Sequence, residues 1–184
     1  PDCPRSEPGA PPSEPNSVSR DSAVADSLMR RVLYRVAARP ASVLHLSPGD
    51  DASVGPVQAG GRCLRSEARN WGDPVGRRDG PCAGHFPIID VAGDLRVGGG
   101  VGQGVLIVRG ALSLDGGFEF YGPVFVMGSI TIRNARLFGG VIAATGGAEV
   151  HLNQGEVVYS TCVLTTTSLA LGEIAPLTQR QWID

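Results

Sequence analysis

The chain has 184 residues and a formal net charge of −2, and all sixteen of its basic residues are arginine. The near-neutral charge argues against a nucleic-acid-binding surface, and the absence of lysine excludes Schiff-base chemistry and the lysine of a phosphate-binding loop. No stretch approaches the roughly 20 apolar residues of a transmembrane helix, so we expect no membrane-spanning segment.

The first part of the chain divides into an arm and a helix. Residues 1–20 hold six prolines and four serines without periodicity, which predicts an extended arm. An amphipathic helix is predicted over 22–38, because apolar residues recur there at intervals of four and Pro40 ends the pattern. Four arginines lie on this helix or directly after it: Arg30, Arg31, Arg35 and Arg39. They form either a solvated face or a docking site for an acidic partner or an anionic surface.

Four cysteines allow three pairings, and none lies in a metal-binding motif. Cys63 and Cys82 flank an irregular loop, so we expect them to pair; by elimination Cys3 would then pair with Cys162. Two disulfides indicate an exported protein. Trp71 lies within the loop and is read as an anchor packed on the core, with docking or stacking on a sugar as the alternative. Residues 21–87 are therefore predicted to be a helix and a disulfide-closed loop packed on the following domain.

A six-residue repeat occupies the centre of the chain, marked by Gly98, Gly104, Gly110, Gly116, Gly122, Gly128, Asn134, Gly140 and Gly146. Apolar residues follow two and four places later, as in Leu106/Val108, Leu112/Leu114, Phe118/Phe120, Val124/Val126, Ile130/Ile132 and Ile142/Ala144. Because side chains alternate across a strand, this phase predicts a three-sided parallel β-helix over 88–163, with about four to five coils and a corner at each hexad. The protein is thus predicted to be mainly β, with one N-terminal helix and a C-terminal tail or cap over 164–184.

One hexad conflicts with the pattern, since the repeat would place Arg136 inside the core. A buried unpaired guanidinium is unfavourable, so either the phase shifts until Leu137 points inward or the coil bulges. We favour the bulge.

No catalytic constellation is found. Hexapeptide acyltransferases carry an aliphatic residue directly before the glycine, where this chain has residues such as Arg109, Asp115 and Arg133. The outward carboxylates are scattered, and a three-histidine metal site would need His45, His85 and His151 to converge. The sequence therefore predicts no enzyme activity, no metal and no cofactor.

Several stretches resemble uncharacterised bacterial envelope proteins of the pilus-assembly, PilX-like type. They include Asn70 to Pro74 (NWGDP), Phe86 to Ile89 (FPII), Gly102 to Val108 (GQGVLIV) and Gly116 to Pro123 (GGFEFYGP). The likeness covers about residues 61–184 and transfers no functional residue. The coil pattern is also similar to bactofilin, a polymer-forming right-handed β-helix, which implies a right-handed coil.

Together these observations predict a non-catalytic scaffolding module. We expect an accessory subunit of a bacterial envelope assembly, located in the periplasm or at the cell surface and peripheral to the membrane. Its partners would be other envelope proteins, or a second copy through the exposed ends of the solenoid. The alternative is a carbohydrate-binding or carbohydrate-cleaving β-helix that uses Trp71, Tyr121 or Tyr159 as stacking platforms.

Overall fold

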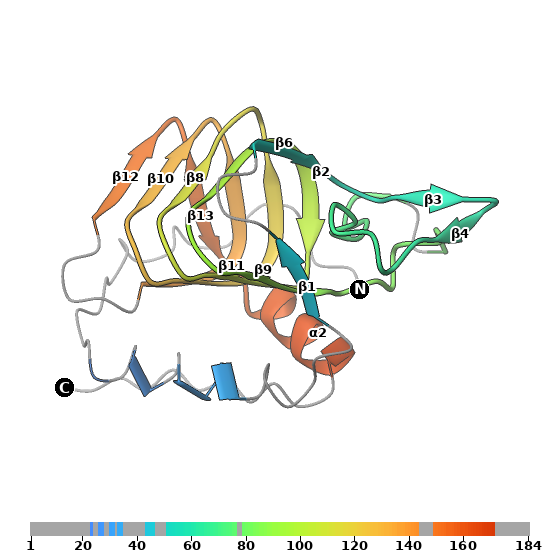
Figure 1. Ribbon diagram of the computed structural model, residues 1–184, viewed down its shortest axis with the longest axis horizontal. Coiled ribbons are helices and arrows are strands. Elements are labelled where there is room, and N and C mark those ends of the chain that lie inside the picture. The colour runs from blue at the N-terminus through green and yellow to red at the C-terminus, as the bar shows by residue number, and fades with distance from the viewer. Residues whose placement is uncertain are drawn as a thin grey trace, which may run out of the picture.

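A computed structural model describes residues 23, 26–27, 30–31, 33–34, 43–46, 51–76, 79–143 and 149–171. The fold is mainly β and contains a parallel β-solenoid of about four turns (Figure 1). Its strands are β1 (Val43–Leu46), β2 (Asp51–Val54), β5 (Ile88–Val91), β6 (Leu95–Gln103), β7 (Val105–Val108), β8 (Leu112–Leu114), β9 (Glu119–Val126), β10 (Ile130–Arg133), β11 (Arg136–Ala143), β12 (Val150–Asn153) and β13 (Glu156–Tyr159). A separate antiparallel hairpin pairs β3 (Gln58–Ala59) with β4 (Arg62–Cys63).

The strands pair in parallel with those one turn later. Ile88 of β5 pairs with Val105 of β7, and Leu106 of β7 pairs with Val124 of β9. One turn therefore takes about eighteen residues, as the hexads predict. The first turn is much longer in sequence: β1 pairs with β5 and β2 pairs with β6. The disulfide-closed loop and the β3–β4 hairpin are inserted into this turn, between β2 and β5.

The interior is formed by the apolar residues that the repeat selects. The buried cluster includes the predicted pairs Leu106/Val108, Leu112/Leu114, Phe118/Phe120, Val124/Val126 and Ile130/Ile132, all at 1% exposure or less. Burial of a large apolar side chain is worth about 1.5–3 kcal/mol, so this column of side chains is the main source of the solenoid's stability. The inward-facing part of the repeat is confirmed over these pairs. The predicted inward position of Ile142 is wrong: Val141 and Ala143 pack against the interior, and Ile142 packs against an apolar cluster on the outside of the solenoid.

The hexad that contains Arg136 follows the alternative that we did not favour. Ala135 and Leu137 are buried, whereas Arg136 is exposed and donates a hydrogen bond from Nη2 to Oε1 of Glu119 on the neighbouring strand. β11 pairs with β9 without a break in register from Arg136 to Ala143. The predicted bulge is wrong: the chain shifts by one residue, because this places Leu137 in the core and leaves the guanidinium in solvent beside a carboxylate.

The backbone differs among the hexad positions. Positive φ angles occur at Gly104, Gly116 and Gly122, and at Asn134 with a value of 45°. Gly98, Gly110, Gly128 and Gly140 do not have them. The repeat position is thus not the same turn throughout, although Asn134 does adopt the conformation for which asparagine is suited.

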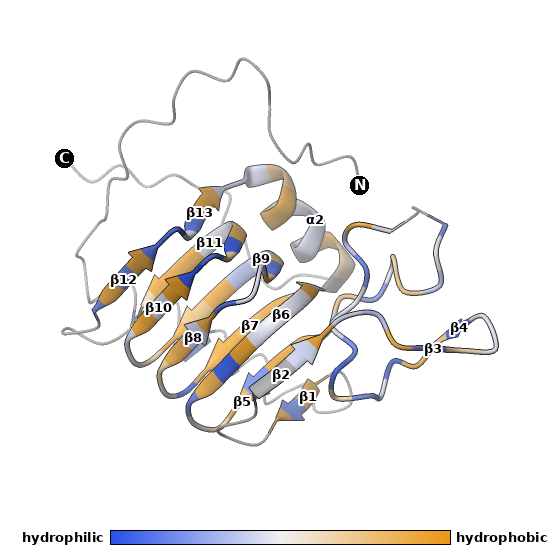
Figure 2. Ribbon diagram, turned by 90° about the horizontal axis from the view of Figure 1, so that it is seen from above, coloured by the Kyte–Doolittle hydropathy of each residue, from blue (hydrophilic) through white to orange (hydrophobic). Residues whose placement is uncertain are grey.

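A helix with described bounds lies near the C-terminus, which the sequence analysis did not predict. Helix α2 (Thr161–Leu171) packs beside β9 and β11, and it lies next to them in Figure 2. Val163 donates its backbone N–H to Oγ of Ser160, an N-cap bond, and its side chain packs with Tyr121 and Phe138. α2 carries no charge and its threonines favour strands, so packing on the solenoid rather than local propensity selects the helix.

The predicted helix over 22–38 falls mostly outside the described residues. Its seven described residues, at 23, 26, 27, 30, 31, 33 and 34, are all helical. Leu33 packs against a second apolar cluster, which lies on the outside of the solenoid and consists of Ile88, Val105, Ile107 and Phe125 with Met127, Val43 and Ile142 at its margin. All four residues of β7 are buried, because alternate side chains of this strand pack in the interior and in the outer cluster.

Candidate functional site

The best candidate for a functional surface is the end of the solenoid formed by β12. Val150 and Leu152 of β12 pair in register with Ile130 and Ile132 of β10 and continue the same interior column. Ile130 and Ile132 are fully buried, whereas Val150 and Leu152 are 53% and 52% exposed. Among the described strands, β12 pairs only with β10. We call this free edge with its two exposed apolar residues the open end.

The open end is polar around its apolar centre. It forms a shallow depression of about 570 Å³ lined by Thr131, Arg133, Val150, His151, Leu152 and Asn153. His151 Nε2 lies 3.0 Å from Oε2 of Glu149, and both side chains are largely exposed. A free strand edge offers unpaired backbone donors and acceptors, so this surface is suited to adding a further strand, with apolar contacts on one face and polar groups at the rim.

The opposite end of the solenoid is closed. Leu46 of β1 and Val54 of β2 belong to the interior cluster and are only 7% and 4% exposed. Figure 1 shows the β3–β4 hairpin projecting near this end and β12 at the other. The two ends therefore differ in what they expose, and only the β12 end presents half-exposed core residues among those described.

Trp71 lies on the inserted loop, and its side chain packs into the interior of the solenoid. The residue is fully buried, and its ring meets Phe118 and Phe120 edge to face at centroid distances of 5.9 Å and 6.1 Å. It fills the space above Gly102, whose partner in register one turn later is Phe120. The reading of Trp71 as a loop anchor is supported, whereas the indole has no open face for docking or for stacking on a sugar.

A buried polar cluster holds the loop in place behind Trp71. Asn70 Nδ2 donates to the carbonyls of Val57 and Leu64 at 3.1 Å and 2.8 Å. Gln103 Nε2 donates to the carbonyls of Ala83 and His85 at 2.9 Å and 3.0 Å. Among the described residues no buried side-chain nitrogen or oxygen lacks a partner, so the cluster is structural and offers no free group to a ligand.

His85 belongs to the same cluster. Its Nε2 lies 3.2 Å from the backbone oxygen of Asn70, and the residue is 7% exposed. Burial lowers the pKa of His85 below its usual value, and the nearby Arg65 lowers it further, while the contact with the Asn70 carbonyl opposes both. His85 is therefore held neutral at physiological pH.

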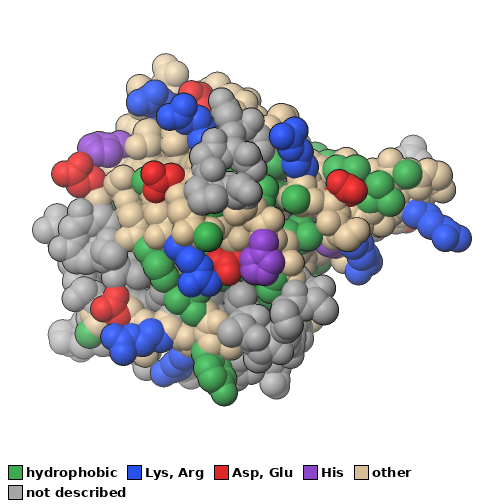
Figure 3. Space-filling model, viewed as in Figure 1, with side chains coloured by type: hydrophobic (Ala, Val, Ile, Leu, Met, Phe, Trp, Pro, Cys, Tyr) green, Lys and Arg blue, Asp and Glu red, His purple; other side chains and the backbone are tan. Residues whose placement is uncertain are grey.

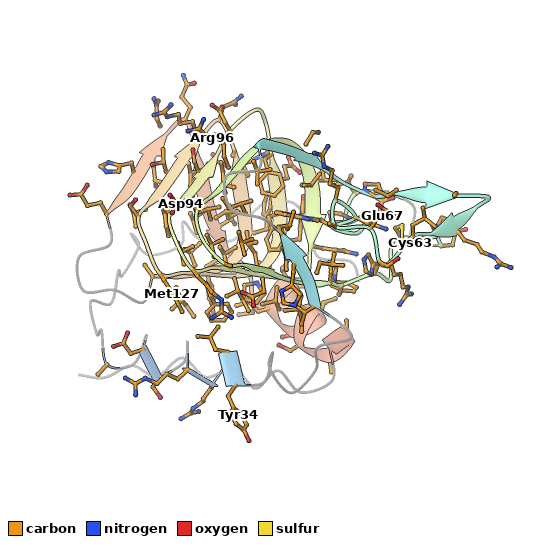
Figure 4. All side chains as sticks on the ribbon, in the orientation of Figure 1. Tyr34, Cys63, Glu67, Asp94, Arg96 and Met127 are labelled. Carbon is orange, nitrogen blue, oxygen red and sulfur yellow. A yellow bond between two sulfur atoms is a disulfide. The ribbon has the colours of Figure 1, made fainter. Side chains whose placement is uncertain are left out.

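The predicted disulfide between Cys63 and Cys82 is present and lies at the base of the hairpin (Figure 4). The bridge closes a loop with a sequence separation of 19, which in the chain-entropy model stabilises the fold by about 3 kcal/mol. Cys162 is also disulfide-bonded. Cys3, its predicted partner, lies outside the described residues, so that pairing stays a prediction.

The other predicted docking residues are only partly described. Arg30 and Arg31 are exposed, and Arg35 and Arg39 lie outside the described residues. Of the proposed sugar-stacking residues, Tyr121 is 9% exposed and stacked on Phe138 at 4.6 Å. Tyr159 is 52% exposed and is thus the one member of that set that could meet a sugar.

Two features of the surface were not recognised in the sequence. Asp90 is 8% exposed at its side chain and accepts two hydrogen bonds from Arg109, from Nε at 3.0 Å and from Nη2 at 2.8 Å. This bond to Asp90 raises the pKa of Arg109. The exposure of Val150 was likewise missed, since the repeat places it inward, four residues after Gly146, and the repeat assigns no inward position to Leu152. Spacing cannot reveal either feature, because both depend on which strands lie next to each other.

The described surface shows no sign of a metal centre. No group of three or more His, Cys, Asp or Glu side chains lies close enough to hold a metal within the described ranges. Figure 3 shows acidic and basic side chains interspersed over the face in view. None of the helices in the described part of the chain is long and apolar enough to cross a membrane.

Comparison with known proteins adds no relative: no protein family, curated protein or solved structure matches this chain.

Proposed function

We propose that the protein is a non-catalytic structural module that joins a larger assembly through its open end. The proposal rests on the contrast between Ile130 and Ile132, which are fully buried, and their register partners Val150 and Leu152, which are half exposed. Leaving the apolar surface of these two side chains in water is unfavourable by roughly 25 cal/mol for each Å². A partner strand that covers them recovers this free energy.

The rest of the solenoid suits the role of a rigid support. Its interior is filled by apolar side chains, and its buried polar groups are satisfied among the described residues. We propose in addition that the coil is three-sided and right-handed, on the basis of the eighteen-residue period and the likeness of its pattern to bactofilin. Such a stack transmits the position of one end to the other with little bending.

We place this function outside the cytoplasm, as an accessory part of a bacterial envelope assembly of the pilus-assembly type. The disulfide between Cys63 and Cys82 supports this location, because disulfides persist in oxidising compartments. The partners we propose are other envelope proteins or a second copy of the chain.

The test is the oligomeric state of the purified protein, measured by size-exclusion chromatography with light scattering over a range of concentrations. We expect self-association that is lost in the Val150→Lys, Leu152→Lys double variant, since charges on an edge strand oppose pairing. A matched control replaces Val75 and Leu169, which are 39% and 77% exposed elsewhere, with lysine.

The control should associate like the unmodified protein. A protein that is monomeric at every concentration would exclude self-assembly through the open end. Equal loss of association in both double variants would show that the effect is general surface charge and not the open end.

A further inference from the structure

The backbone groups of β12, the strand at the edge of the open end, alternate in direction. The backbone oxygen of Glu149 accepts a hydrogen bond of 2.8 Å from the N–H of Ile130 on β10. Because every second residue of a strand turns its N–H and C=O to the same side, His151 also bonds toward β10, whereas Val150 and Leu152 turn their backbone groups to the free edge. The same two residues carry the half-exposed apolar side chains.

The strand is therefore symmetric about His151. If two copies of β12 pair antiparallel with the two His151 residues opposite each other, Val150 of each copy lies opposite Leu152 of the other. Each opposed pair then exchanges two backbone hydrogen bonds and brings two apolar side chains together. A shift by one residue would oppose edge-facing groups to groups already bonded to β10, and a shift by two would oppose Leu152 to residue 148 or Val150 to Gln154, outside the strand.

We infer that the open end is occupied by a second copy of this chain, joined head to head through antiparallel β12 strands, an inference that rests on the function proposed above. The two-fold axis passes through the His151 pair, normal to the sheet, so the interior faces of both sheets lie on the same side. Val150 and Leu152 of both copies then continue one interior column across the interface.

The assembly closes at two copies. A head-to-tail stack would need the opposite end of the solenoid as well, where Leu46 and Val54 are already buried and the β3–β4 hairpin projects nearby (Figure 1). The head-to-head pair uses the open end alone, which is the isologous arrangement of a two-fold dimer.

The polar rim is compatible with this register. Glu149 of one copy lies opposite Asn153 of the other, so that an amide meets a carboxylate and no two carboxylates are opposed. His151 Nε2 of each copy lies 3.0 Å from Oε2 of its own Glu149.

The experiment is disulfide cross-linking of the full chain, with one cysteine placed on β12 and oxidised with diamide. The cysteines in the described part of the chain are all disulfide-bonded and do not compete. Opposed residues that are not hydrogen-bonded to each other in antiparallel strands have Cα atoms about 4.5 Å apart, which a disulfide spans. H151C should therefore run at twice the chain mass on a non-reducing gel, and a mixture of E149C with N153C should give the same product.

The matched control is N153C alone, on the same face of the same strand. Its two copies would lie about 14 Å apart along the paired strands, beyond the reach of a disulfide, so N153C should stay at the mass of one chain. Adding V150K and L152K to H151C should abolish the cross-link, and circular dichroism melting should show that every variant is folded.

Equal cross-linking of H151C and N153C would overturn the head-to-head register, and a species larger than two chains in light scattering would overturn the closed dimer. Failure of H151C to cross-link, while association still depends on Val150 and Leu152, would overturn this inference and leave the proposed function standing. Association that V150K/L152K does not change would overturn both.

Discussion

Trp71 and Gly102 form a knob and a hole between the inserted loop and the solenoid, and their coupling can be measured. A Cβ on Gly102 would lie 3.0 Å from Cε3 of Trp71 and 3.0 Å from Cδ2 of Phe120. Replacing Trp71 with alanine removes the largest fully buried side chain, together with its edge-to-face contacts to Phe118 and Phe120. Each single change thus disturbs the same volume in opposite directions.

The magnitudes follow from this packing. Trp71→Ala should lower the free energy of unfolding by about 3–5 kcal/mol, as large-to-small core changes do. Gly102→Ala alone should cost about 1–3 kcal/mol, because the added methyl group has no space between two aromatic rings. In the double variant the contact with Trp71 is gone, and the Phe120 ring can move into the cavity and away from the methyl group, so most of the cost of Gly102→Ala should disappear.

Urea denaturation followed by far-ultraviolet circular dichroism, with the disulfide intact, gives the four free energies of the double-mutant cycle. We expect a coupling of about 1–3 kcal/mol, which exceeds the roughly 0.5 kcal/mol within which independent sites add. Additive losses would refute the reasoning, since they would show that Trp71 does not occupy the space above Gly102.

Two further predictions concern the buried histidine and a close backbone approach. Because the pKa of His85 is lower in the folded protein, the unfolded chain takes up the proton first: the free energy of unfolding should be constant above about pH 7, fall as the pH drops below about 6.5, and level off below the folded pKa. Thermal melts should show a smaller fall for His85→Gln, and an unchanged profile in that variant would contradict the assignment. Gly122→Ala should cost more than about 3 kcal/mol in urea denaturation, since φ is 152° and the new Cβ would lie 1.9 Å from the Gly104 carbonyl oxygen. The control Gly117→Ala, with φ of 76° and open space, should cost only about 1–2 kcal/mol, and equal losses would show that backbone strain alone decides both.

Much of the fold follows from local pattern. The alternation at Leu112/Leu114 and Ile130/Ile132 predicts which side chains enter the core, because a strand turns successive residues to opposite faces whatever surrounds it. The pairing of Cys63 with Cys82 was likewise predictable from a short loop between two cysteines. Arg136 was not placed correctly, because spacing alone does not distinguish a bulge from a shift of one residue.

The candidate surfaces were less accessible to sequence reasoning. Val150 reads as a core residue like Ile130, and only the absence of a further paired strand beside β12 in the described part of the chain makes it exposed. Trp71 was predicted to be an anchor packed on the core, with docking as the alternative, and only its contacts with Phe118 and Phe120 decide between the two. For each residue the local sequence is compatible with both a buried and an exposed position, so the spacing along the chain does not decide between them.

By itself the sequence determined the repeat, the inward-facing residues from Leu106 to Ile132 and the disulfide-closed loop, because these depend on side-chain alternation and on short separations along the chain. Tertiary structure decided that α2 folds against β9 and β11, that Trp71 fills the space above Gly102, and that the β12 end of the solenoid is the open one. Each of these is set by contacts between residues far apart in sequence, and the free energy of those contacts exceeds the local preferences that a pattern records.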